Sequence, residues 1–198
     1  FEDIVAGISL YRPGPMDFIP NYIKGKNNPK EISYVTPELE SILEPTYGCI
    51  VYQEQVMQIV QKLAGYTMGQ ADNIRRAMSK KKQYVIDAER QSFVYGDKER
   101  GIKGCVANSI YDSMVDFAKY AFNKSHAAAY AKISVQTAWL KNYYPVEFMA
   151  ALMTSVIDNS AKAAQYLYSC RDMGIKVLPP DINCGQGEFT AEGDHVRY

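Results

Sequence analysis

The sequence lacks the residues and segments that mark several common classes of protein. Its 198 residues include four cysteines, two histidines and one tryptophan, and the cysteines are scattered without a Cys-x-x-Cys pair. Zinc sites and disulfide frameworks need clustered ligands, so we expect neither, and we predict reduced thiols in a cytoplasmic protein. There is also no run of about 18 apolar residues that could cross a membrane, and no basic-then-apolar leader.

An excess of charge of one sign is absent as well. Twenty-two lysines and arginines balance 22 aspartates and glutamates. Binding to nucleic acid without sequence preference grows with the number of phosphates neutralised, so this balance argues against a generally adhesive nucleic-acid-binding protein. Any phosphate-binding chemistry should therefore be local. Because the sequence begins with Phe1 and has no initiator methionine, we expect a piece of a longer protein.

The short motifs of common enzymes are missing. The sequence has no phosphate-binding G-x-x-x-x-G-K-[ST], no dinucleotide-binding G-x-G-x-x-G, no G-x-S-x-G and no H-E-x-x-H. No pair of aspartates is placed where strands could present them to two metal ions, and Asp181 stands alone beside prolines. We therefore predict no catalytic residue and no metal ligand within this chain.

Helical patterns are plentiful, and they predict a mainly α, multi-helix domain with long loops. The clearest helix repeats apolar residues at the spacing of one buried face from Val56 to Ala64, and Gly65 ends it. Thr67 and Gln70 have the spacing of a capping box that opens the next helix. Further helices are expected within 4–8, 106–120, from Asn123 or Ser125 to Tyr144, and within 145–156 and 161–173.

The remaining stretches are predicted to be loops with little regular structure. Residues 21–45 are polar and rich in Pro, Gly and Asn, which indicates a long surface loop with a short strand at 32–35. Residues 83–104 are charged, so we expect them to be exposed. A short β element is expected near the C-terminus, where 175–183 has the pattern of a strand followed by a stiff turn.

One stretch concentrates positive charge. Residues 73–82 read NIRRAMSKKK and contain no acid; their cations are Arg75, Arg76, Lys80, Lys81 and Lys82. A solvated helix face is one interpretation. However, like charges at i, i+4 repel each other, and on a face without a counter-ion a bound polyphosphate would reduce that repulsion. Arginine forks give paired hydrogen bonds to phosphate oxygens, and lysines add point charge.

A second cationic zone is interleaved with aromatic residues. The stretch from Phe117 to Val146 contains no Asp or Glu. Its cations are Lys119, Lys124, Lys132 and Lys141. Aromatic faces beside cations are typical of proteins that stack bases while holding the backbone. The alternative is that these aromatics belong to the core. His126 is equally compatible with a capping or phosphate-contact role and with packing in the core.

Several segments together resemble the alpha subunits of bacterial DNA polymerase III, the family C replicative polymerases. They follow the family's order and spacing over nearly the whole chain, and the family has Gly where this chain has Ser79. The segments are SLYRPGPM (9–16), LEPTYGCIVYQEQVMQI (43–59), GYTMGQADNIRRAMSKKK (65–82), FNKSHAAAYAKISVQTAWLKNYYPVEFMAALM (122–153) and KVLPPDIN (176–183).

The resemblance implies that residues 1–198 form a fingers domain, with the catalytic palm upstream and helix-hairpin-helix modules downstream. It implies that Arg75, Arg76 and Lys80–Lys82 bind the triphosphate of the incoming nucleotide. It also places Asn123, Lys124, Ser125 and His126 in the active-site cleft. Two further sites are implied for the cleft wall, at Arg12 and at Tyr52 with Gln53.

The same resemblance implies the activity and the partners. The full subunit would be a DNA-directed DNA polymerase, with Mg²⁺ held by palm aspartates, whereas this chain alone should be inactive. Expected partners are deoxynucleoside triphosphates, primer-template DNA and the palm, with the sliding clamp and other replisome subunits bound by other regions, and no membrane. Two alternatives stay open: a non-catalytic module for single-stranded nucleic acid, and a structural helical scaffold.

Overall fold

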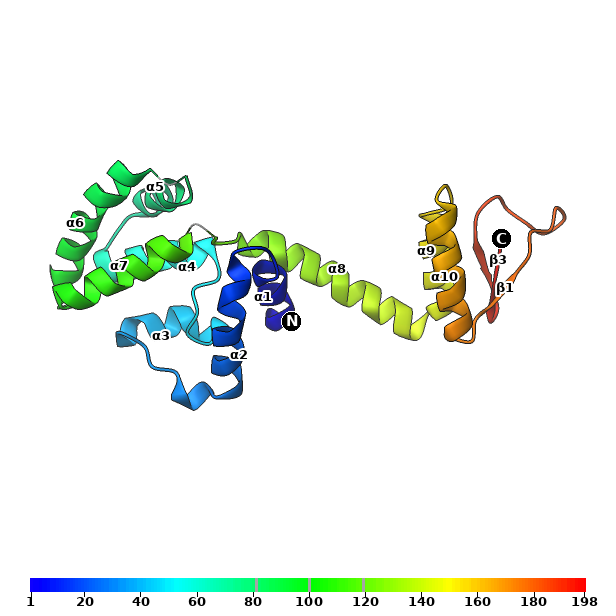
Figure 1. The fold of residues 1–198 in the computed structure, drawn as a ribbon, viewed down its shortest axis with the longest axis horizontal. Helices are drawn as coiled ribbons and strands as arrows, with labels where there is room; N and C mark the ends of the chain where they lie inside the picture. The colour runs from blue at the N-terminus through cyan, green and yellow to red at the C-terminus, as the bar shows by residue number, and fades with distance from the viewer. Residues whose placement is uncertain (81, 100, 119) are drawn as a thin grey trace. The chain divides into compact units, whose positions relative to one another are not determined.

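The computed structural model describes residues 1–80, 82–99, 101–118 and 120–198, which divide into two compact units, Phe1–Ala131 and Lys132–Tyr198. Helices dominate, as the sequence predicted (Figure 1). The α-helices are α1 (Glu2–Leu10), α2 (Ile19–Asn27), α3 (Pro37–Leu43), α4 (Gln53–Ala64), α5 (Met68–Ser79), α6 (Gln83–Glu99), α7 (Gly104–Ala118), α8 (Lys124–Tyr143), α9 (Pro145–Thr154) and α10 (Ser160–Asp172). Short 3₁₀ helices are η1 (Pro15–Phe18), η2 (Pro29–Glu31) and η3 (Glu44–Thr46).

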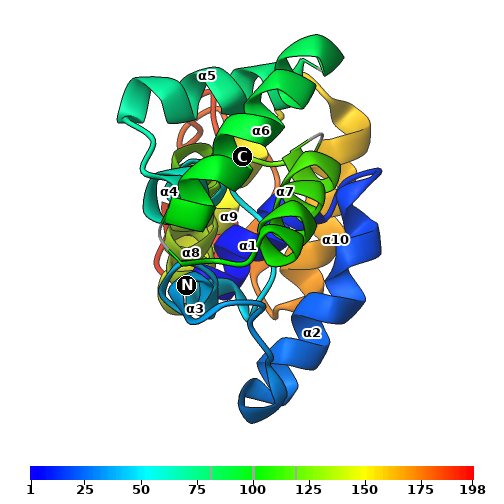
Figure 2. The ribbon, with the colours of Figure 1, turned by 90° about the vertical axis from the view of Figure 1, so that its left-hand side faces the viewer.

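Helix α4 is the centre of the first unit. Its predicted apolar face is buried except at Ala64, which is half-buried, and α3, α5, α6 and α7 pack around it (Figure 2). The buried residues of that face are Val56, Ile59, Val60 and Leu63. Burying one such side chain contributes roughly 1.5–3 kcal/mol, so this face anchors the helices that surround it.

The predicted helix boundaries around Gly65 are confirmed. Gly65 has a left-handed conformation with φ of 75°, which suits a residue without a side chain at the end of α4. Two residues later the capping box forms: the hydroxyl of Thr67 accepts from the Gln70 backbone N–H at 3.3 Å, and Gln70 Oε1 accepts from the Thr67 N–H at 2.9 Å. Because both caps are local, α5 leaves α4 in a fixed direction.

Two predicted loops are wrong in part. Residues 21–45 contain α2 and α3, and 32–35 form no strand because no other segment pairs with them among the described residues. Residues 83–104 contain α6, which buries Ile86 and Phe93 against the core. Those two apolar positions are seven apart and lie on one helix face, but the charged residues between them hide the pattern.

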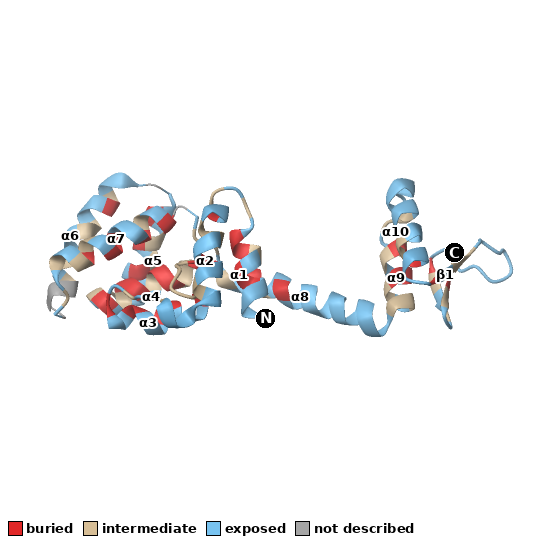
Figure 3. Ribbon diagram, turned by 60° about the horizontal axis from the view of Figure 1, so that its bottom comes forward, coloured by how far each residue is buried: buried red, intermediate tan, exposed pale blue. Residues whose placement is uncertain are grey.

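A second, smaller core lies where the start of α8 meets α1. Ala127 and Ala131 of α8 are fully buried with Val5 and Ala6 of α1. The small alanine side chains allow the two helices to approach closely. Further along α8, Figure 3 shows mostly exposed residues, and the side chains of Tyr130, Ile133 and Leu140 are exposed.

The second unit combines helices with a small sheet. Pro145 begins α9, as predicted, and Met149 and Met153 of α9 are buried with Cys170 of α10 and Val196. The three strands, β1 (Lys176–Leu178), β2 (Thr190–Glu192) and β3 (His195–Arg197), have the order β1-β3-β2. β1 pairs with β3 in parallel and β2 pairs with β3 antiparallel, which confirms a short β element near the C-terminus.

One buried polar residue connects α4 to the chain that precedes it. Gln55 is 5% exposed, and its Oε1 accepts from the backbone N–H of Val51 at 2.7 Å and of Tyr52 at 3.0 Å. Its Nε2 donates to the Ile42 carbonyl at 3.1 Å and to the Thr46 hydroxyl at 2.7 Å. The amide therefore bonds four groups inside the unit, including two backbone N–H groups before α4.

We predict that Gln55→Leu destabilises the chain by about 3 kcal/mol or more, because it leaves several buried polar groups without partners. Denaturant unfolding followed by circular dichroism would measure the loss. The control is Gln58→Leu, which changes an exposed residue of the same helix and should have little effect. Equal stability of the two variants would contradict the role given to Gln55.

Candidate functional site

The site is organised by the pairing of two segments that lie far apart in the sequence. Tyr52 and Phe122 form an isolated parallel β-bridge. The Gln53 N–H donates to the Phe122 carbonyl at 2.9 Å, and the Phe122 N–H donates to the Val51 carbonyl at 3.3 Å. Because α4 begins at Gln53 and α8 begins at Lys124, this pairing places the N-termini of the two helices next to each other.

Gln53 extends the connection to α5. Its Nε2 donates to the Ala121 carbonyl at 3.1 Å, and its Oε1 accepts from Arg75 Nη1 at 3.1 Å. The Arg75 side chain is 22% exposed. Two of the predicted site residues are therefore in direct contact, and the Gln53 amide connects the arginine to the segment that leads into α8.

The arginine pair has a counter-ion, which corrects the prediction from the sequence. Asp72 lies one residue before the acid-free stretch and reaches both arginines, at the i, i+3 and i, i+4 positions. Its Oδ1 lies 2.6 Å from Arg75 Nη2, and its Oδ2 lies 2.7 Å from Arg76 Nε. The hydrogen bond from Arg75 and the charges of both arginines hold the pKa of Asp72 below its usual value.

Two lysines of the basic stretch, Lys80 and Lys82, lie beyond the helix. α5 ends at Ser79, so Lys80 is its C-cap residue and Lys82 precedes α6, which corrects the prediction that these cations share one helix face with the arginines. Both side chains are exposed, and neither pairs with an acid within the part of the chain that the structure describes. Lys81 lies outside the described residues.

Lys124 is held by two glutamates at the start of α8. Both carboxylate oxygens of Glu54 accept from its backbone N–H at 3.1 Å, so Glu54 satisfies the first turn of the helix. The Nζ of Lys124 lies 2.9 Å from Glu2 Oε2 and 5.2 Å from the centre of the Tyr52 ring. This predicted cation is therefore neutralised within the unit.

The rest of the FNKSH segment forms the exposed first turn of α8. Asn123 Oδ1 accepts from the His126 N–H at 2.9 Å, so Asn123 is the N-cap residue. The His126 ring lies between Phe122 and Tyr130, with centroid distances of 5.5 and 4.8 Å. His126 and Ser125 are exposed, which leaves both side chains accessible.

Arg12 stabilises the turn that faces this segment. Its Nη2 donates to the Tyr120 carbonyl, its Nε donates to the Ser9 carbonyl at 2.9 Å, and its guanidinium lies 4.7 Å from the centre of the Phe122 ring. Burial lowers the pKa of Arg12. Gly14, with φ of 100°, lets the same turn approach the Tyr120 ring, where a Cβ would lie 2.6 Å from a ring carbon. The structure therefore gives Arg12 a structural role.

Tyr52, predicted for the cleft wall, is buried inside the first unit. It is 2% exposed, and its hydroxyl makes no hydrogen bond within the described part of the chain. Burial, together with the charges of Glu2 and Glu54, raises the pKa of the phenol. The phenol is therefore neutral at physiological pH, and the face of its ring makes a cation–π contact with the Lys124 ammonium.

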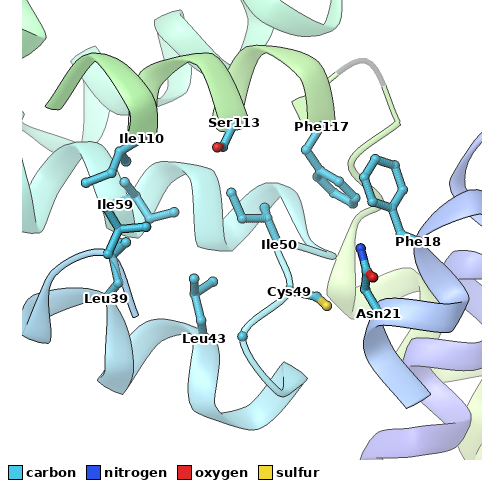
Figure 4. A pocket seen from close by; sticks show the side chains of 12 residues that line it. Phe18, Asn21, Leu39, Leu43, Cys49, Ile50, Ile59, Ile110, Ser113 and Phe117 are labelled. Carbon is cyan, nitrogen blue, oxygen red and sulfur yellow. The ribbon is translucent and has the colours of Figure 1, made fainter. Parts of the chain in front are cut away.

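A separate apolar pocket of about 310 Å³ opens elsewhere in the first unit. Figure 4 shows Leu39, Ile59 and Ile110 on one side and Phe18 with Phe117 on another. Asn21, Cys49 and Ser113 supply its polar groups, and burial raises the pKa of the Cys49 thiol. None of the residues predicted from the sequence for substrate binding lines this pocket, so it is distinct from the arginine site.

No group of three or more His, Cys, Asp or Glu side chains in the described residues is arranged to hold a metal ion. None of the helices in the described ranges has both the length and the hydropathy needed to cross a bilayer. The arrangement instead offers exposed cations on α5 and after it, next to the capped start of α8.

Sequence reasoning missed the three carboxylates that complete the site. The spacing of Asp72 to both arginines was a usable signal. Glu54 and Glu2 gave none, since Glu54 is 70 residues from the backbone group it caps. The pairing partner of Gln53 was equally invisible in the sequence.

The fold and site are those of a helical domain that presents cations from a rigid helix. This chain belongs to the family described as the bacterial DNA polymerase III alpha subunit finger domain, whose model matches residues 1–101. Among curated proteins it is 50% identical over 197 residues to the DNA polymerase III subunit alpha of Bacillus subtilis, a match that covers 100% of this chain.

Other relatives carry the same name. The chain is 52% identical to the subunit alpha of Pasteurella multocida over 96% of its length, and 48% identical to that of Thermus aquaticus over 100%. It spans 17–18% of the length of these relatives. The resemblance stated from the sequence is thus confirmed, and the matched proteins are much longer than this chain.

We predict that Gln53 and Arg75 stabilise the unit cooperatively. A double-mutant cycle of Gln53→Ala with Arg75→Ala, measured by denaturant unfolding, should give a coupling energy of about 1 kcal/mol, since the two side chains share a hydrogen bond. The control cycle pairs Gln53→Ala with Arg76→Ala, whose side chains do not touch, and should give a value near zero. Equal coupling in both cycles would show that the amide does not orient Arg75.

Proposed function

We propose that this chain is the part of a DNA-directed DNA polymerase that binds the triphosphate of the incoming deoxynucleotide and helps to position the template. The observation that carries the proposal is the placement of Arg75 and Arg76 on a capped, well-packed helix, next to the exposed start of α8. Membership of the finger-domain family supports it.

The two arginines would contribute differently. The Arg76 side chain is 64% exposed and makes one ion pair, so its guanidinium is open to a ligand. Arg75 is held by Asp72 and Gln53 and would act at closer range to the α8 segment. Lys80 and Lys82, at the end of α5, would add positive charge for the terminal phosphates.

The chemistry would be attack of a primer 3′-hydroxyl on the α-phosphate, with pyrophosphate leaving. This chain would neutralise charge on the β- and γ-phosphates and hold the nucleotide in line for attack. Magnesium ions would supply Lewis acidity in such a reaction, but the described residues offer no cluster of ligands for them, so they would be bound by the palm of the full subunit. Contacts with the sliding clamp and the replisome would also lie in other regions.

The exposed start of α8 would face nucleic acid. Asn123, Ser125 and His126 are exposed at a helix N-terminus, where backbone N–H groups and the helix dipole favour phosphate. Tyr130 is exposed beside His126, which suits stacking against a base or sugar. This combination supports a role in positioning template or primer.

The same exposed aromatics favour one rival, a module that binds single-stranded nucleic acid without nucleotide. Such binding would weaken steeply with salt and would not need a triphosphate. Titration of the full subunit with single-stranded and duplex DNA at several salt concentrations, with and without nucleotide, separates the two. If the affinity for DNA is the same with and without nucleotide at every salt concentration, the rival is favoured.

We predict that Arg76→Ala and Arg75→Ala in the full subunit each lower the rate of nucleotide incorporation about tenfold or more, because a hydrogen bond to a charged group contributes on the order of 1.5–3 kcal/mol. Steady-state kinetics on a primed template would measure this. Arg90→Ala is the matched control, since Arg90 pairs with Asp112 between α6 and α7 and should change the rate little. Wild-type rates for both site variants would remove the phosphate-binding role from α5.

We further predict that the 198-residue chain alone does not extend a primer, since it contains no cluster of carboxylates that could hold catalytic metal ions among its described residues. A primer-extension assay with purified chain, Mg²⁺ and all four nucleotides would test this. Extension that persists in chain made free of host polymerase would place a catalytic centre here and contradict the proposal.

A further inference from the structure

Asp72 serves both arginines of α5 with separate oxygen atoms. Its Oδ1 accepts from Arg75 Nε at 2.9 Å and from Arg75 Nη2 at 2.6 Å. Its Oδ2 lies 2.7 Å from Arg76 Nε. The carboxylate therefore occupies the position between the two guanidiniums where an anionic ligand would gain most from binding.

The two pairs differ in how firmly they are held. Arg75 is also bound by Gln53 from α4, and its side chain is largely covered. Within the described ranges of the chain, Arg76 has only Asp72 as a partner, and its side chain is mostly exposed. A ligand can therefore take Arg76 from Asp72 without disturbing Arg75.

We propose that Asp72 is a positioning residue that acts as a replaceable counter-ion for Arg76. Between turnovers the Asp72 carboxylate holds the Arg76 guanidinium in place. The nucleotide phosphates displace the carboxylate when they bind, and the ion pair forms again when pyrophosphate leaves. This inference rests on the proposed function of α5. Without Asp72 the two guanidiniums that now share its carboxylate would repel each other, and a polyphosphate would bind them without competition. Asp72 thus weakens ground-state binding and favours product release.

The test uses the full subunit on primed template, with inorganic pyrophosphate as the probe. In Asp72→Asn the inhibition constant of pyrophosphate and the KM for nucleotide should both fall by about fivefold, the effect of removing one competing unit charge at about 4 Å in a solvated site. The kcat should fall as well, because the product leaves more slowly. Asp72→Glu keeps the charge and should restore values close to those of the wild type.

Two control variants separate this effect from a structural one. Asp112→Asn removes a carboxylate from an equally short arginine pair, with Asp112 Oδ1 2.6 Å from Arg90 Nη2, and should leave the inhibition constant unchanged. In the Arg76→Ala background, Asp72→Asn should no longer tighten pyrophosphate, because the competed group is gone.

The outcomes also separate this inference from the proposed function. If Arg76→Ala weakens nucleotide and pyrophosphate but Asp72→Asn fails to tighten them, the proposed function stands and the role of Asp72 is overturned. If Arg76→Ala changes neither constant, α5 does not bind the triphosphate and both proposals fail.

Discussion

The hydrogen bonds between residues 51–53 and 121–122 are the constraint on which the candidate site depends. They join segments about 70 residues apart, and they set the N-terminus of α4 beside that of α8. Through Gln53 the same contact reaches α5, whose direction is already fixed by Gly65 and the Thr67 cap. Three helices thus share one junction, and its side chains come from parts of the sequence that have no local relation.

Charge at this junction is matched almost group by group. Asp72 faces the arginine pair, while Glu54 and Glu2 hold the backbone and side chain of Lys124. A site built this way can contain many cations in a chain of zero net charge. This pairing also disfavours non-specific binding to DNA, because a cation that already has a carboxylate partner gains little free energy from contact with a single phosphate. On the proposed function, a triphosphate with its higher charge density would be the ligand able to displace the resident carboxylate.

Sequence reasoning succeeded where the determinants were local and failed where they were distant. The helix of Val56 and Ile59, its stop at Gly65 and the cap at Thr67 follow from spacing and from backbone preferences that a few neighbouring residues decide. Helix α6 was missed because Ile86 and Phe93 are its main buried anchors among many charged residues. The predicted site residues Arg75 and Gln53 do meet, but their contact depends on tertiary pairing. Tyr52 and Arg12, predicted for a cleft wall, make internal contacts in this structure.

The internal contacts of those two residues explain why a site of exposed cations can still be well ordered. Arg12 and Tyr52 both contact the 120–124 segment. The Arg12 guanidinium lies over the Phe122 ring, and the Tyr52 ring faces the Lys124 ammonium. Gln55 fixes the opposite side by satisfying the backbone before α4. Side chains that reach outward, such as Arg76 and His126, therefore stand on a base of buried partners. On the proposed function, the cost of ordering these side chains would be met during folding, so the nucleotide would meet cations that are already oriented.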